Sequence, residues 1–204
     1  MKNVENYFYV KKIQIPSHVK IEFINNIILL QGPLGSIKLD LKKMDSSGLG
    51  FFYINNKTNE LEIYVKKISK KAKSFFGSLI AFFQNNFYGV CQGFLIYLEL
   101  HGVGYRAILH ERHSSVGIKS SLGAKSLQEI EFKIGQTHDI FYTIPENIRI
   151  FSLKPNLFCL YGLEKTQITQ IAAEIKNLKL PEPYKGKGIR YKDEIIQIKV
   201  GKKK

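Results

Sequence analysis

The feature that most constrains this chain is an internal repeat. Ile15-Pro16-x-x-Val19-x-Ile21 recurs as Ile144-Pro145-x-x-Ile148-x-Ile150, and Asn26-x-Ile28-x-Leu30-x-Gly32 recurs as Asn156-x-Phe158-x-Leu160-x-Gly162. The spacing is 129 residues for the first pair (144 − 15) and 130 for the second (162 − 32), so the second copy contains one inserted residue. Alternating apolar residues between turn residues are typical of paired strands. The repeat therefore predicts a duplicated strand-pair module.

Each copy also leads towards an amphipathic helix. Apolar residues recur at helical spacing from Ala72 to Phe87 and again from Glu164 to Leu178. In the first copy a further strand pair, around Phe52–Ile54 and Leu61–Val65, lies between the repeat and the helix. We expect an α+β fold of two duplicated modules, each a small, mainly antiparallel sheet with one packed helix. The expected divisions are an N-terminal module over residues 1–88, a C-terminal module over residues 89–180 and a basic tail over residues 181–204.

The charge of the chain points to a polyanionic partner. The 204 residues carry a net charge of +14, from 31 basic and 17 acidic side chains. Half of this excess lies between Lys176 and Lys204, a stretch that contains ten basic and three acidic residues. A solvated helix face usually mixes the two signs. The imbalance favours nucleic acid as the partner, ahead of an anionic membrane surface.

The basic region opens with a distinctive motif, Pro181-Glu182-Pro183-Tyr184-Lys185-Gly186-Lys187-Gly188-Ile189-Arg190-Tyr191. The two prolines end the preceding helix and favour extended geometry. In an extended chain the two lysines would lie on one side, while the two glycines would leave the backbone bare on the other. Bare backbone can approach phosphates closely, and the planar side chains can stack on bases or ribose. The motif predicts a structured RNA-contacting segment, whereas a flexible basic tail is the simpler alternative.

This motif resembles the C-terminal signature of the large-subunit ribosomal protein six family, in its bacterial and organellar form. Gly102-Val103-Gly104-Tyr105-Arg106-Ala107 resembles the mid-chain signature of the same family, at the expected distance. Gly135-Gln136-Thr137-His138 resembles a third segment, with Gln136 where the family has tyrosine. The resemblance is strong from Leu95 to Ala107 and from Ile130 onwards, and thin from Ser36 to Phe87.

The resemblance implies a structural, non-enzymatic constituent of the large ribosomal subunit that supports translation. It implies binding to large-subunit rRNA near the stalk base and the factor-binding region, beside neighbouring ribosomal proteins. It implies no cofactor, metal, membrane or small-molecule substrate. The residues that it implies for RNA contact, with the adjoining Lys192 added on its charge, are Tyr184, Lys185, Gly186, Lys187, Gly188, Arg190, Tyr191, Lys192, Tyr105 and Arg106.

Two functions of other classes are less well supported by the residues. An RNA-processing enzyme could use His138 and Asp139 as an acid–base pair, but no neighbouring nucleophile can be named. A membrane-surface protein could bind through the lysines, but lipid attraction needs only charge and gives no role to the tyrosines and glycines. His110 and His113 lack a third ligand at metal-binding spacing. Residues 101–132, which contain them, are expected to form a long hairpin loop.

The composition bears on the compartment. Cys91 and Cys159 are too few for a disulfide framework and are expected to be small buried side chains in a reducing compartment. Lysine, asparagine, isoleucine, phenylalanine and tyrosine are abundant, and tryptophan is absent. This bias indicates an AT-rich genome, and residues 1–10 lack the pattern of a transit peptide. We expect an organelle-encoded protein of the mitochondrial matrix, with a bacterial cytoplasm as the alternative.

Overall fold

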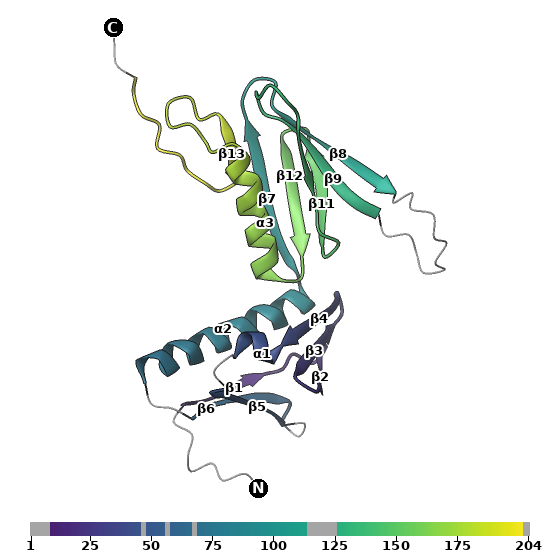
Figure 1. Ribbon diagram of the computed structural model, residues 1–204, viewed down its shortest axis with the longest axis vertical. Coiled ribbons are helices and arrows are strands. Elements are labelled where there is room, and N and C mark those ends of the chain that lie inside the picture. The colour runs from purple at the N-terminus through teal and green to yellow at the C-terminus, as the bar shows by residue number, and fades with distance from the viewer. Residues whose placement is uncertain (1–8, 46–47, 56–57, 67–68, 114–125, 202–204) are drawn as a thin grey trace. The chain divides into compact units, whose positions relative to one another are not determined.

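The computed structural model describes residues 9–45, 48–55, 58–66, 69–113 and 126–201. The chain divides into two compact units, Met1–Gly93 and Phe94–Lys204 (Figure 1). The division falls five residues later than the expected 88/89 boundary because the long helix of the first unit continues to Cys91. The residues expected as a separate tail belong to the second unit.

The first unit consists of two three-stranded antiparallel sheets and a long helix. One sheet has the order β1-β6-β5 and the other the order β2-β3-β4. Its elements are β1 (Tyr9–Gln14), β2 (Lys20–Ile24), β3 (Ile27–Gly32), β4 (Gly35–Asp40), the short α1 (Leu41–Met44), β5 (Gly50–Asn55), β6 (Glu60–Val65) and α2 (Lys70–Cys91).

The core of the first unit lies between its strands and α2. Ile28 and Leu30 of β3, two residues apart and hence on one face of the strand, are fully buried. Phe83 of α2 is also fully buried, and its ring centroid lies 5.4 Å from that of Phe52 on β5. Ser69 caps the helix because its Oγ accepts a hydrogen bond from Ala72 N at 3.0 Å. The helical spacing of apolar residues is thus explained by burial of one helix face.

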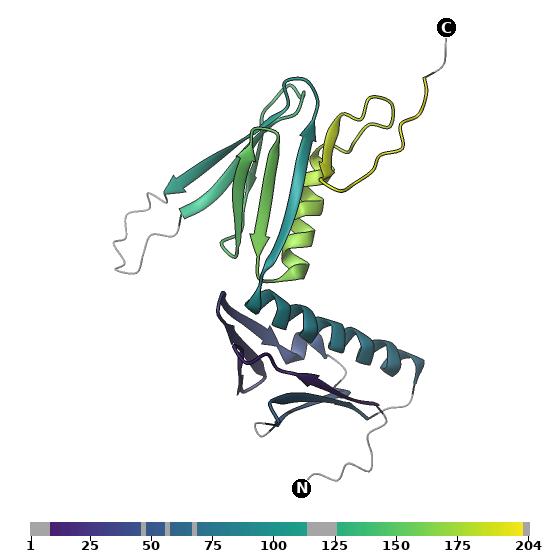
Figure 2. The ribbon, with the colours of Figure 1, turned by 180° about the vertical axis from the view of Figure 1, so that it is seen from behind.

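The second unit has a three-stranded sheet of order β10-β9-β8, a four-stranded sheet of order β11-β12-β7-β13, and one helix. The helix, α3, packs on one face of the four-stranded sheet against β7, β12 and β13, as both views show (Figures 1 and 2). The elements are β7 (Phe94–His101), β8 (Arg106–His113), β9 (Ser126–Lys133), β10 (Ile140–Thr143), β11 (Ile148–Lys154), β12 (Leu157–Gly162), α3 (Lys165–Leu178) and β13 (Gly188–Tyr191).

One apolar cluster joins all the layers of the second unit. It includes Phe132 of β9 and Phe158 of β12, whose ring centroids lie 5.7 Å apart. Ile168 and Ile175 of α3 and Ile189 of β13 are fully buried in the same cluster. The expected α+β fold of two duplicated modules is confirmed, with two small sheets in each module rather than one.

Backbone hydrogen bonds at the two Ile-Pro turns show how closely the copies correspond. Ile15 N donates to Asn59 O at 3.0 Å, and Ile144 N donates to Gln128 O at 2.9 Å. After each proline the chain closes the same turn, with Val19 N bonded to Pro16 O and Ile148 N bonded to Pro145 O. The hairpins that follow, β2-β3 and β11-β12, are both antiparallel. The repeated sequence therefore forms the same strand pair twice.

The strands outside the repeat pair in the same way but follow a different chain order. In the first unit β4, β5 and β6 follow the repeated hairpin, whereas in the second β7, β8 and β9 precede it. The pairings nevertheless match: β3-β4 corresponds to β12-β7, and β1-β6-β5 corresponds to β10-β9-β8. The two units thus have the same pattern of strand pairing but connect the strands in a different order along the chain. The sequence repeat alone does not reveal this relation.

Two sequence-based expectations need correction. Residues 101–132 do not form a long loop within the described residues, because β8 and β9 pair from Arg106↔Lys133 to His113↔Ser126; residues 114–125 lie outside the described residues. The segment after Pro181 is also not free of the body. Gly188–Tyr191 forms β13 and pairs antiparallel with β7, from Gly188↔His101 to Tyr191↔Leu98.

Gly32, at the end of β3, provides a test of packing in the first unit. A Cβ at this position would lie 2.6 Å from Val90 O and 2.8 Å from Val90 Cβ on α2. We therefore expect Gly32→Ala to lower the free energy of unfolding by about 1–3 kcal/mol, because the helix must move away from β3. The matched control is Gly77→Ala, where nothing lies within 4 Å and the helix should gain up to about 1 kcal/mol. Urea denaturation of the full chain measures both; equal effects would contradict this packing.

Candidate nucleic-acid interface

The predicted RNA-contacting motif is held in place by β13. Ile189 N donates to Lys179 O at 2.8 Å, which ties the strand to the end of α3. Ile189 itself is fully buried and lies opposite Leu100 of β7. A buried apolar side chain and a sheet register fix the strand from two directions. The motif is therefore part of the folded unit, which corrects the expected division into a body and a separate tail.

Residues 182–187, which we name the basic loop, form a closed turn rather than an extended run. Glu182 N donates to Lys187 O at 2.8 Å, and Gly186 N donates to Glu182 O at 2.9 Å. Gly186 has φ +65°, a left-handed conformation that glycine adopts without strain. The expected extended geometry is wrong here, because these bonds fold the chain back on itself. Tyr184 and Lys185 lie at the exposed tip of the loop.

Gly188 has a packing role and not the expected phosphate-facing one. Its φ is +145°, and a Cβ would lie 2.6 Å from Pro181 Cα and 2.7 Å from Leu180 O. The residue is buried against its own chain. Its bare backbone therefore admits the Leu180–Pro181 segment. Of the two glycines, Gly186 alone has open space around the position of its missing side chain, with nothing within 4 Å.

The mid-chain motif forms the turn between β7 and β8. Tyr105 N donates to Gly102 O at 3.2 Å. The Tyr105 ring packs against the apolar core and occupies the space where Gly102 or Gly135 would carry a Cβ, at 2.8 Å and 3.1 Å. Tyr105 is thus a packing residue. Arg106 is exposed at the start of β8, where its side chain can reach a partner.

Three loops lie at one end of the second unit, the upper end in Figure 1. The register Gly188↔His101 places the basic loop beside the Gly102–Arg106 turn. The β11-β12 turn joins them, since Leu100 N donates to Asn156 O at 2.8 Å and Ala107 N donates to Pro155 O at 2.9 Å. The exposed Lys154, the last residue of β11, lies beside this third loop and is a further candidate that sequence reasoning missed. The one sequence feature that could have drawn attention to Lys154 is its position beside the inserted residue of the repeat.

Arg190 projects from β13 towards β7, where it faces Glu99. Arg190 Nη2 lies 3.5 Å from Glu99 Oε2, and His101 Nε2 lies 2.9 Å from the same oxygen. The hydrogen bond from His101 lowers the pKa of Glu99, with a smaller contribution from Arg190. The buried Arg190 Nε has no hydrogen-bond partner among the described residues. A buried donor without a protein acceptor is uncommon.

Glu194 fixes the chain immediately after β13. Lys176 Nζ donates to both Glu194 carboxylate oxygens, at 2.7 Å and 2.8 Å, and Tyr191 N donates to Glu194 Oε2 at 3.2 Å. Lys176 Nζ also lies 4.9 Å from the Tyr191 ring centroid. The hydrogen bond from Lys176 lowers the pKa of Glu194. The carboxylate therefore orients both α3 and Tyr191 within a basic surface.

The sequence-predicted residues fall into three groups by exposure. Tyr184, Lys185, Lys192 and Arg106 are exposed, and Lys192 Nζ lies 5.1 Å from the Tyr97 ring centroid. Gly188 is buried. The remaining residues are half-buried: Gly186, Lys187, Arg190, Tyr191 and Tyr105. Nine of the ten lie in β13, the basic loop and the adjoining turn, and Lys192 directly follows β13, but only some of their side chains face solvent.

Two of the candidates for other chemistry, Asp139 and His110, make local ion pairs or hydrogen bonds. Asp139 pairs with Lys133 Nζ at 3.1 Å, and His110 Nε2 lies 2.8 Å from Glu131 Oε2. No group of three or more metal-ligating side chains occurs in the parts of the chain that the structure describes. Cys91 and Cys159 are both free; Cys159 is buried as expected, whereas Cys91 is only half-buried. Burial raises the pKa of Cys159. Across the described residues, no helix is both long and apolar enough to span a membrane.

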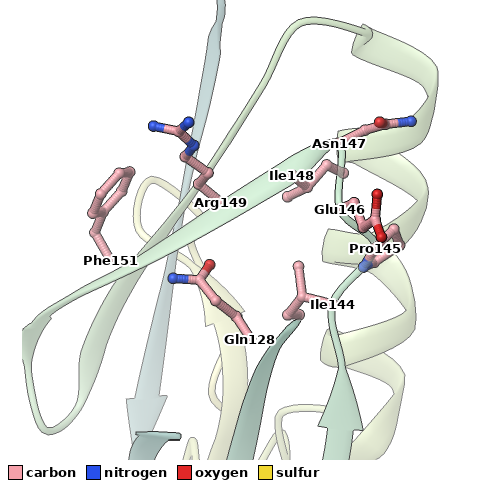
Figure 3. Close-up of a pocket in the computed structure, with 8 residues that line it drawn as sticks. All are labelled: Gln128, Ile144, Pro145, Glu146, Asn147, Ile148, Arg149 and Phe151. Atoms are coloured by element: carbon pink, nitrogen blue, oxygen red, sulfur yellow. The ribbon is translucent and has the colours of Figure 1, made fainter. Parts of the chain in front are cut away.

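A pocket of about 510 Å³ lies at the Ile144-Pro145 turn, at the opposite end of the four-stranded sheet from the basic loop. Arg149, Phe151 and Gln128 point to the same side of it (Figure 3). Gln128 already accepts a hydrogen bond from Ile150 N at 3.0 Å. The first unit has hollows at its own Ile15-Pro16 turn. Because the hollow recurs with the turn, we attribute it to the shape of the repeat.

Comparison with known proteins agrees with the motifs. A model of the family described as Ribosomal protein L6 matches residues 114–192. The large ribosomal subunit protein uL6m of Prototheca wickerhamii is 38% identical over 199 residues, which cover 94% of this chain and 95% of that protein. The protein of the same name from Reclinomonas americana is 33% identical over 201 residues, covering 95% and 97%. The large ribosomal subunit protein uL6 of Hydrogenobaculum sp. (strain Y04AAS1) is 31% identical over 194 residues, covering 94% and 93%. The chain therefore belongs to the uL6 family of large ribosomal subunit proteins, which are structural rather than enzymatic.

Proposed function

We propose that this protein is a constituent of the mitochondrial large ribosomal subunit and binds its rRNA through the basic loop, β13 and the Gly102–Arg106 turn. The site within the subunit is the stalk base and factor-binding region that the family resemblance implies. Similarity to two uL6m proteins over at least 94% of this chain supports a mitochondrial ribosome. Encoding by the organelle rests on the AT-rich composition.

The observation that carries the interface is the closed basic loop. Two hydrogen bonds fix residues 182–187, and β13 fixes the chain that follows. The exposed Tyr184 and Lys185 are thus presented at a defined position before RNA arrives. A preorganised loop loses less conformational entropy on binding than a flexible tail. The lysines would meet phosphates and the tyrosine would stack on a base or a ribose.

Co-sedimentation tests the ribosomal assignment. The tagged protein should travel with large ribosomal subunits in a sucrose gradient of mitochondrial lysate, and purified protein should bind large-subunit rRNA. Recovery only at the top of the gradient, with no affinity for large-subunit rRNA, would rule out this function.

Substitutions of the two neighbouring carboxylates Asp193 and Glu194 test whether RNA binding depends on the position of the interface residues or only on their charge. Glu194→Gln and Asp193→Asn each remove one negative charge from neighbouring residues. Charge alone predicts that both tighten RNA binding equally. Because Glu194 holds Lys176 and Tyr191 N, we expect Glu194→Gln to weaken binding severalfold while Asp193→Asn tightens it slightly.

Filter binding of both variants to the same rRNA fragment across a salt series measures this difference. Glu194→Gln should also remove stability that is present above the pKa of an unfolded glutamate and lost as the pH falls through the lowered pKa of Glu194. Equal tightening by both variants would show that position does not matter.

A further inference from the structure

The chain beyond Glu194 presents aliphatic side chains to solvent to an unusual extent. Ile195, Ile198 and Val200 are 92%, 68% and 90% exposed. We name residues 195–200 the C-terminal segment. Single exposed apolar residues are common on protein surfaces, but three within six residues of one segment indicate that a partner covers it.

The backbone of the C-terminal segment is also largely unpaired. Lys199 N donates to Pro183 O at 2.8 Å. Among the described residues, this is the only main-chain hydrogen bond between residues 195–200 and the rest of the unit. Glu194 anchors the start of the segment through Lys176. The segment is therefore attached at two points, while most of its N–H and C=O groups remain available to another chain.

The side chains of the segment alternate as those of a strand do. In an extended chain the exposed Ile198 and Val200 share one side with the half-buried Ile196, and Ile195, Gln197 and Lys199 share the other. All these apolar residues are β-branched, which favours strand geometry. Exposed β-branched side chains that alternate along the chain, together with a free backbone, are the features of a peptide that adds to the edge of a sheet.

We propose that the C-terminal segment docks as an added strand on an exposed sheet edge of a neighbouring protein in the large ribosomal subunit. This proposal rests on the proposed function. Aliphatic side chains have no π face for stacking on bases, and the groove of an RNA helix that is wide enough to enter displays 2′-hydroxyls and base edges. A partner with an apolar patch beside a strand edge satisfies both the side chains and the backbone. The Lys199–Pro183 bond places this partner next to the RNA that meets the basic loop.

Site-specific photo-cross-linking tests the nature of the partner. A benzophenone amino acid is placed at Ile198 in one variant and at the polar Gln197 in a control variant, and each is incorporated into mitochondrial large subunits. The subunits are purified on a sucrose gradient, irradiated, treated with ribonuclease and analysed by mass spectrometry. We expect position 198 to cross-link to a β-strand of one large-subunit protein and position 197 to give at least tenfold less of that product. Cross-links from position 198 only to rRNA, only within its own chain or to a second copy, or no cross-link at all, would overturn the proposal.

A second pair of variants separates this contact from RNA binding. Ile198→Thr/Val200→Thr keeps β-branching and net charge but removes apolar surface, and Gln197→Thr is the control. The double variant should bind naked large-subunit rRNA within twofold of wild type, yet dissociate from assembled subunits about tenfold faster in a high-salt wash. A parallel loss of naked-rRNA affinity would show that the segment contacts RNA and would overturn the protein-docking proposal. Failure of the wild-type protein to bind rRNA would instead contradict the proposed function.

Discussion

Replacing Gly188 with valine is expected to detach β13 from the sheet. The new Cβ would lie 2.6 Å from Pro181 Cα and 2.7 Å from Leu180 O, and both are backbone atoms that cannot rotate away. The φ of +145° adds strain, because an L-residue rarely adopts this conformation. Overpacking and backbone strain together should lower the free energy of unfolding of the second unit by about 2–5 kcal/mol. RNA affinity should fall as well, because the basic loop loses its anchor.

Urea denaturation and amide hydrogen exchange measure this effect. In the wild-type protein the amides of Ile189 and Tyr191 should be protected without RNA, since they donate to Lys179 O and to the Glu194 carboxylate. In the valine variant this protection should be lost. The matched control is Gly186→Asn, because asparagine tolerates φ near +65° and nothing lies within 4 Å of this position. Unchanged protection at Ile189 in the valine variant would contradict the packing role of Gly188.

Replacing both lysines of the basic loop should weaken RNA binding strongly without unfolding the protein. Lys185 is exposed and Lys187 half-buried, and neither takes part in an ion pair among the described residues. Each lysine that meets a phosphate releases counterions, so Lys185→Gln/Lys187→Gln should flatten the slope of log affinity against log salt by about 1 to 2 units. Affinity at low salt should fall on the order of tenfold for each lysine, the usual size of a charge-assisted hydrogen bond.

The control removes two cations from the other end of the same unit. Arg149 lies by the Ile144-Pro145 turn, and Lys165 begins α3, where its Nζ lies 6.0 Å from the Phe94 ring centroid. Arg149→Gln/Lys165→Gln changes the net charge by the same amount, so equal losses from both pairs would show that binding depends on total charge alone. Circular dichroism confirms folding. Arg190 is left intact because it faces Glu99. A glutamate at position 190 would place two carboxylates opposite each other on β13 and β7, which would destabilise the sheet.

The sequence by itself determined the duplicated α+β modules and the family. Both rest on local patterns: apolar alternation in the repeated hairpins, helical spacing in α2 and α3, and the residues of two long motifs. The spacing of apolar residues shows which face of a helix or strand is buried, and it can be read without knowing which elements pack against that face. The prolines and tyrosines of the Pro181–Tyr191 segment predicted a structured segment, but not that it packs on the body of the second unit.

Only the tertiary structure decided what pairs with what. A strand as short as Gly188–Tyr191 shows little alternation, and its partner β7 is distant in sequence, so β13 could not be recognised locally. The equivalence of β4–β6 with β7–β9 could not be recognised locally either. The two sets of strands make matching pairings, but β4–β6 follow the repeated hairpin in the chain and β7–β9 precede it. Gly188 and Tyr105 were predicted to contact RNA but have packing roles in the structure, and the physical reason is the same for both. A glycine in the sequence indicates that a backbone is approached closely, but only the packed structure identifies the approaching group, here the Leu180–Pro181 backbone at Gly188 and the Tyr105 ring at Gly102.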